Sequence, residues 1–127
     1  MTQEDKNLLL VDLCGRLPYG VACKITFDAE NIFTETLEGI NVKYYNKIAT
    51  SNTACDMECM KPYLRPMSSM TKEEKLMYEG LMIGTDNVSY TLDVIDWLNK
   101  KMFDYRGLIE RGLALEAPRG MYYIKEQ

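Results

Sequence analysis

The chain has 127 residues, 46% hydrophobic and 27% charged, which predicts one soluble globular domain or two small parts that share a core. Its 15 Lys and Arg against 19 Asp and Glu give a net charge of −4, which disfavours a strongly basic nucleic-acid-binding domain. The absence of His excludes Ser-His-Asp and Cys-His catalysis and every His-ligated metal centre. We therefore expect a protein that is not an enzyme and needs no cofactor, with a carboxylate-dependent hydrolase as the least favoured function.

A helix is predicted over residues 3–14, where leucines recur at helical spacing, with Thr2 as its N-cap. Two runs with alternating apolar residues follow, over 21–27 and 32–40, and predict an antiparallel hairpin with a turn at 28–31. A leading helix followed by a curved hairpin resembles the pattern of small SH3-like and Sm-like barrels. We therefore predict an α+β fold that begins with a helix and a small antiparallel barrel.

A third strand is predicted at 41–48, and the small polar residues of 49–56 predict a loop. Residues 61–70 contain Pro62 and Pro66, which preclude a regular helix and predict a short strand or an extended connector between the two halves. Methionine and tyrosine are enriched at protein interfaces. The interface candidates in and beside this connector are Met57, Met60, Tyr63, Met67 and Met70.

The second half of the chain is predicted to be mainly helical. Thr71 and Glu74 have the spacing of a capping box and predict a helix over 72–83. A second helix, starting at Thr91 or Ser89, is predicted to end at Met102. The predicted organisation is a helix plus barrel-like region, the connector and a helical region, which together could form one integrated domain: 1–60, 61–70 and 71–127.

A short helix is predicted over 104–111, and the alternating tail predicts a closing hairpin around a turn at 118–120. Helices followed by a hairpin resemble a winged-helix module, with residues 102–111 in the place of its recognition helix. The alternative to protein contact is therefore a weak DNA- or RNA-binding regulator. Its phosphate-facing cations would be Lys100, Lys101, Arg106, Arg111 and Arg119.

The cysteines are predicted to be free thiols. No secretory signal is apparent, and no apolar run approaches the roughly 18 residues that span a bilayer, so we expect a reducing cytoplasm and no membrane association. Cys55 and Cys59 lie close together, but a structural zinc site usually pairs two such clusters, so we expect no metal. The remaining two cysteines are Cys14 and Cys23.

Three segments of the second half carry a family resemblance: KPYLRPMSSMTKEE over 61–74, IDWLN over 95–99 and FDYRGLIERGLALEAP over 103–118. They resemble a group of small uncharacterised proteins of gut bacteria, often found in phage-like or mobile-element regions. The resemblance implies a bacterial cytoplasm and an accessory role, and it implies no activity. We therefore expect a non-enzymatic interaction or adaptor protein that binds an unidentified protein partner or forms a homo-oligomer.

Overall fold

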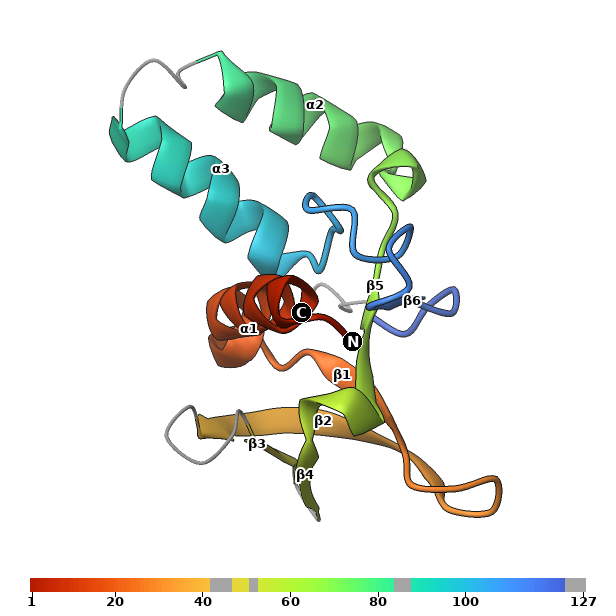
Figure 1. The fold of residues 1–127 in the computed structure, drawn as a ribbon. Helices are drawn as coiled ribbons and strands as arrows, with labels where there is room; N and C mark the ends of the chain where they lie inside the picture. The colour runs from red at the N-terminus through yellow and green to blue at the C-terminus, as the bar shows by residue number, and fades with distance from the viewer. Residues whose placement is uncertain (42–46, 51–52, 84–87, 123–127) are drawn as a thin grey trace.

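The computed structural model describes residues 1–41, 47–50, 53–83 and 88–122. It has an α+β fold, in which helix α1 (Gln3–Arg16) lies against a sheet and helices α2 (Lys72–Met82) and α3 (Val88–Lys100) form a hairpin at one end (Figure 1). The strand order is β4-β3-β2-β1-β5-β6. The strands are β1 (Ala22–Thr26), β2 (Ile32–Asn41), β3 (Lys47–Thr50), β4 (Ala54–Asp56), β5 (Met60–Leu64) and β6 (Leu115–Glu116).

The predicted first helix is confirmed, and Thr2 caps it by accepting a hydrogen bond from the Asp5 backbone N–H at 3.0 Å. The helix continues past Gly15 to Arg16 because Gly15 faces α3 and does not act as a C-cap. A Cβ atom on Gly15 would lie 2.9 Å from Nδ2 of Asn99. The glycine therefore allows the two helices to approach closely.

The predicted hairpin is also confirmed, since β1 and β2 pair antiparallel from Ala22↔Thr36 to Thr26↔Ile32. Residues 42–46 of the predicted third strand lie outside the described residues. The loop predicted over 49–56 is wrong, because β3 and β4 pair antiparallel in this region. Each strand is too short to show a clear alternation, and pairing with its neighbours stabilises it.

The sheet includes part of the predicted connector. Strand β5 pairs with β1 on one side and with β6 on the other, and it buries alternate residues. Those buried residues are Met60, Pro62 and Leu64. Among the described strands β4 and β6 are the two edges, so the sheet is open and a closed SH3-like or Sm-like barrel is not confirmed.

The α2 prediction is confirmed together with its capping box, and the short helix predicted over 104–111 is wrong. That segment forms turns, and Gly107 and Gly112 adopt φ of +74° and +78°, which interrupt a helix. The predicted tail hairpin is also wrong in its described part. Strand β6 instead pairs parallel with β5, and Ala117 N–H donates to the Leu64 carbonyl at 2.7 Å. Residues 123–124 lie outside the described part of the chain.

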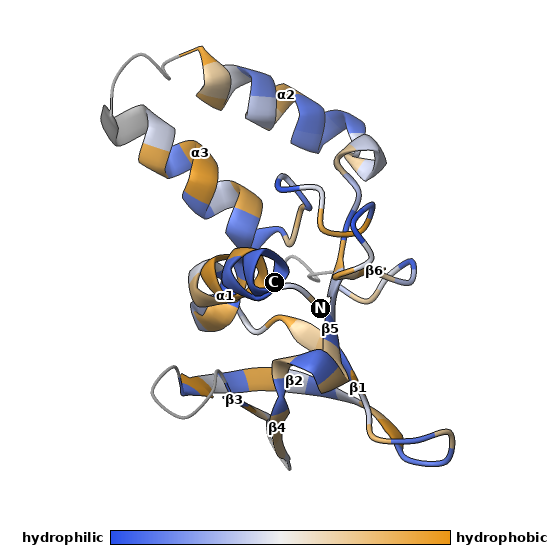
Figure 2. Ribbon diagram, in the orientation of Figure 1, coloured by the Kyte–Doolittle hydropathy of each residue, from blue (hydrophilic) through white to orange (hydrophobic). Residues whose placement is uncertain are grey.

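Two apolar clusters form the core. The larger one joins α1, the inner face of the sheet and the segment around Leu108–Ala114. The smaller one lies between α3, α2 and the segment before α2, and it centres on Val94, Leu98 and Phe103. Apolar and polar stretches alternate along α1 and α3, as expected of helices with one buried side (Figure 2). Within the described residues no helix is long and apolar enough to cross a membrane.

Candidate functional site

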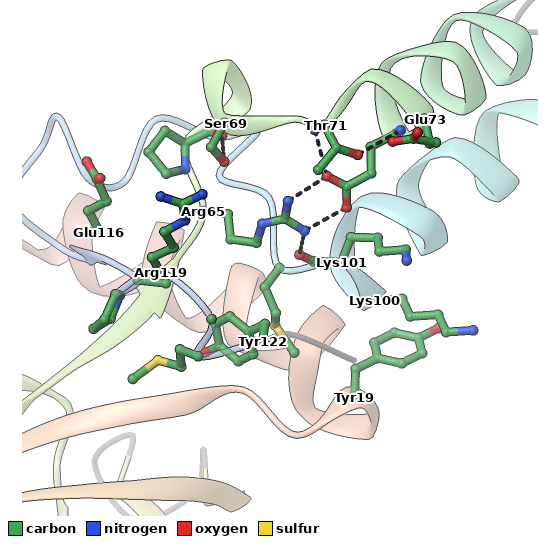
Figure 3. Close-up of a pocket in the computed structure, with 17 residues that line it drawn as sticks. Tyr19, Arg65, Ser69, Thr71, Glu73, Lys100, Lys101, Glu116, Arg119 and Tyr122 are labelled. Carbon is green, nitrogen blue, oxygen red and sulfur yellow. Dashed lines mark hydrogen bonds and ion pairs between the residues drawn. The ribbon is translucent and has the colours of Figure 1, made fainter. Parts of the chain in front are cut away.

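A pocket of about 890 Å³ lies where the end of β5, the start of α2, the end of α3 and the tail after β6 meet (Figure 3). Part of its wall is apolar, formed by residues such as Pro66 and Met121. We call it the basic pocket because four cations line it against three carboxylates. These charged residues are Arg65, Lys100, Lys101, Arg119, Glu73, Glu74 and Glu116.

Arg65 is held in place by three elements. Its guanidinium donates to both oxygens of Glu74, at 2.8 and 2.6 Å, and to the Lys101 carbonyl at 3.4 Å. Its Cζ lies 4.1 Å from the centroid of the Phe103 ring. Arg65 therefore joins β5 to α2 and to the end of α3, and its charge is already balanced by Glu74.

Glu74 also completes the N-terminal cap of α2. One of its oxygens accepts from the Thr71 backbone N–H at 2.9 Å, and its own N–H donates to the Thr71 hydroxyl at 3.1 Å. The Arg65 guanidinium, and to a smaller extent the Thr71 N–H, lower the pKa of Glu74 from its ordinary 4.5 to about 2. Glu74 is therefore ionised across the physiological range and serves as a structural anion.

The other three cations have no ionic partner among the described residues. Lys100 and Lys101 come from the end of α3, and Arg119 comes from the tail. Figure 3 shows Arg119 on the side of the tail and Lys100 and Lys101 on the opposite side, near the end of α3. Two elements distant in sequence thus place three available positive charges around one concavity.

A tight reversal after α3 places these lysines on the surface. The Phe103 N–H donates to the Leu98 carbonyl at 3.0 Å, and the Met102 N–H donates to the Asn99 carbonyl at 3.1 Å, which is a Schellman motif. Met102 occupies the left-handed position of the motif, with φ of +64°, where glycine is usual. Its side chain is 1% exposed, so core packing offsets the backbone strain.

The remaining two predicted cations lie elsewhere. Nε of Arg106 is 3.4 Å from the Asp12 carboxylate, and Nη1 of Arg111 is 3.4 Å from the Asp5 carboxylate. Both carboxylates belong to α1. The turns at 104–112 direct these two arginines to α1, so the five predicted cations do not share one surface.

Tyr122 ties the tail to the centre of the sheet. Its phenol oxygen accepts from the Ala22 N–H at 2.8 Å and donates to the Tyr63 carbonyl at 2.7 Å. Burial raises the pKa of this phenol well above its ordinary value, despite the hydrogen bond from Ala22. This contact fixes the pocket wall formed by the tail, and no local sequence pattern indicates it. The same is true of the Arg65–Glu74 pair.

The structure places the predicted interface residues mainly inside. Met57 and Met60 are 2% and 1% exposed and belong to the larger core cluster. Met67 and Met70 are partly buried against the smaller cluster, and Tyr63 is half-buried on β5. In this structure Met57 and Met60 are not accessible to a partner, because their strand and turn direct them into the core.

Other apolar side chains are exposed instead. On α2, no described residue is buried, and Leu76, Met77 and Ile83 beside it are largely exposed. At the β1–β2 turn, Phe27 and Phe33 are 49% and 41% exposed. Sequence periodicity alone does not distinguish such residues from core residues.

Two of the four free cysteines, Cys23 and Cys55, are buried. Burial raises the pKa of Cys23 to about 12 and that of Cys55 to about 11, so both remain protonated. Among described residues no three His, Cys, Asp or Glu side chains are grouped so as to hold a metal ion.

Comparison of the chain with protein-family models, with curated proteins and with solved structures finds no match in any of the three. The geometry of the basic pocket is therefore the basis for the proposal below.

Proposed function

We propose that this chain is a non-enzymatic protein-interaction module that holds an acidic segment of a partner protein in the basic pocket. The observation that carries the proposal is that Lys100, Lys101 and Arg119, which have no ionic partners among the described residues, line one partly apolar concavity. Carboxylates of a partner would pair with these cations while its apolar side chains cover the pocket wall. An adaptor role in a phage or mobile element is proposed from the sequence resemblance.

A protein segment fits this pocket better than a nucleic acid does. Nucleic-acid binding commonly neutralises six to ten phosphates, roughly, and this pocket offers three available cations. Glu73 and Glu116 on the wall would repel a continuous phosphate backbone. A segment with separated carboxylates and an apolar residue avoids this repulsion. The chain's net charge of −4 also disfavours binding to a nucleic acid.

The exposed side of α2 supports a protein partner as well. Leu76 is 65% exposed and Ile83, directly after the helix, is 85% exposed. Apolar side chains that gather on one exposed helix commonly mark a contact with another protein. Since α2 also supplies Glu73 and Glu74 to the basic pocket, a partner seated there has this helix beside it.

The test is selection of peptides by the whole chain. A display library of random dodecapeptides is panned on the immobilised protein, and enriched peptides are measured by fluorescence anisotropy at about 50 and 200 mM salt. We expect enrichment of peptides with at least two carboxylates. Their affinity should fall about tenfold or more in a Lys100→Glu/Lys101→Glu variant, a change of about 1.4 kcal/mol.

The matched control is Lys24→Glu/Lys61→Glu, which makes the same charge change on β1 and β5, outside the pocket lining. This control should bind the selected peptides about as well as the wild type. No acidic enrichment, or equal loss in both variants, would overturn the proposal. A labelled DNA duplex that binds more tightly than any peptide, and only with Lys100 and Lys101 intact, would assign the pocket to nucleic acid instead.

A further inference from the structure

The turn between β1 and β2 carries acidic and exposed apolar side chains, which complement the basic pocket. Residues 27–33, which we call the hairpin tip, contain the two acidic residues Asp28 and Glu30. The rings of Phe27 and Phe33 meet edge to face with centroids 6.3 Å apart, although both side chains are exposed to solvent. Ile32 beside them is 46% exposed. The tip is thus acidic and apolar at once.

The tip is also organised in advance of any contact. One Asp28 carboxylate oxygen accepts from the backbone N–H groups of Glu30 and Asn31, both at 2.9 Å. The Asn31 side chain donates to the same carboxylate, and the Phe27 N–H donates to the Asn31 carbonyl at 3.0 Å. A turn fixed in this way loses little conformational entropy when it docks. Glu30 is left with its carboxylate in solvent.

The tip cannot enter the pocket of its own chain. The β1–β2 turn projects beyond the sheet on the side away from α2 and α3 (Figure 1). The pocket lies where α2, α3 and the tail meet (Figure 3). An occupant with this chemistry must therefore come from a second molecule.

We infer that the basic pocket binds the hairpin tip of a second copy of this chain. The inference rests on the proposed function and names the acidic segment. Glu30 and Asp28 would face Lys100, Lys101 and Arg119, and a tip phenylalanine would cover the apolar wall. The two surfaces differ, so the contact is head-to-tail and leaves a free tip and a free pocket at the ends. Such contacts extend into rings or filaments.

The test is sedimentation velocity of the full chain at about 50 mM salt, from about 5 to 500 μM, a range that detects micromolar to submillimolar contacts. The apparent mass of the wild type should rise with concentration to at least about twice the 14.7 kDa of the monomer. A pocket variant, Lys100→Glu/Lys101→Glu, and a tip variant, Phe27→Ala/Glu30→Lys, should each stay monomeric. Glu110→Lys, an exposed change outside both surfaces, should assemble as the wild type does.

Mixing the two defective variants gives the decisive result. The pocket variant keeps an intact tip, and the tip variant keeps an intact pocket, so an equimolar mixture should form 1:1 dimers and nothing larger. A monomeric wild type, assembly that survives both variants, or a mixture that stays monomeric would overturn the inference. Peptide selection separates the two proposals: a monomeric wild type that still selects acidic peptides removes only self-docking, and loss of acidic enrichment removes the proposed function.

Discussion

Glu74 is the residue on which the pocket wall depends most directly. Its carboxylate takes two hydrogen bonds from Arg65 and one from the Thr71 N–H, so one side chain both caps α2 and fixes β5 to it. Since Arg65 is neutralised within this pair, the charge available to a ligand comes from the lysines of α3 and from Arg119. The pocket therefore holds one pair of charges that neutralise each other, Arg65 and Glu74, and three cations without ionic partners among the described residues.

We predict that Glu74→Gln lowers the free energy of unfolding at pH 7 by about 1–2 kcal/mol, because the ionic hydrogen bonds to Arg65 are lost. The folded-state pKa of Glu74 is lowered from 4.5 to about 2, so its stabilisation is complete above pH 4.5 and is lost as the pH falls toward 2. Urea denaturation across this range should show wild type and variant converging. Glu79→Gln, exposed on the same helix, is the control, and a pH-independent difference would contradict the prediction.

At the scale of elements, the close contact between α1 and α3 depends on a glycine in α1, which has no side chain. Gly15 lies against Asn99, whose Oδ1 accepts from the Tyr105 hydroxyl at 2.7 Å. Asn99 is 4% exposed, and the hydrogen bond from Tyr105 holds its amide in place. A glycine inside a helix is normally unfavourable, and here the close approach of α3 explains it.

We predict opposite signs for two Gly→Ala substitutions. Alanine favours a helix over glycine by about 1 kcal/mol, but at Gly15 overpacking against Asn99 costs about 1–3 kcal/mol, so Gly15→Ala should lower the thermal midpoint. Gly80 in α2 has open space around it, so Gly80→Ala should raise the midpoint. Calorimetry of both variants checks the pair. A raised midpoint in both variants would show that the Asn99 side chain moves aside without destabilising the fold.

At the scale of the whole molecule, Arg16 joins the two core clusters. It belongs to α1, is fully buried, and donates to the Asp12 carboxylate at 2.7 and 3.1 Å. It also donates to the Phe103 carbonyl at 2.6 Å. Phe103 is a member of the smaller cluster, where its ring stacks on Trp97. Loss of either partner would leave the buried Arg16 charge incompletely compensated, which is strongly destabilising. Arg16 therefore couples the two clusters.

We predict that the chain unfolds in one cooperative transition. Trp97 is the only tryptophan and reports the smaller cluster by fluorescence, while far-ultraviolet circular dichroism reports the helices and the sheet. Because Arg16 and the tail link the clusters, the two probes should give the same urea midpoint. Separate midpoints would instead show that the regions 1–60 and 71–127 unfold as independent units.

Elements determined by neighbouring residues were predictable from the sequence. The leucine spacing and Thr2 predicted α1, the alternation around residues 28–31 predicted the β1–β2 hairpin, and the Thr71–Glu74 pair predicted α2. Each pattern involves only a few neighbouring residues, so it predicts its helix or hairpin without knowledge of the rest of the chain. For the candidate site, three of five predicted cations reached the basic pocket, and no local signal selected them from the other two.

The sequence by itself determined the α+β composition, the main helices and the first hairpin, because capping and periodicity are local. Only the tertiary structure decided that β6 pairs parallel with β5, that Arg106 and Arg111 turn to α1, and that the tail closes the pocket. These outcomes depend on contacts between residues far apart in the chain, such as Tyr122 with Ala22. Such contacts form only when many elements bury their apolar surface together, which no short stretch of sequence specifies.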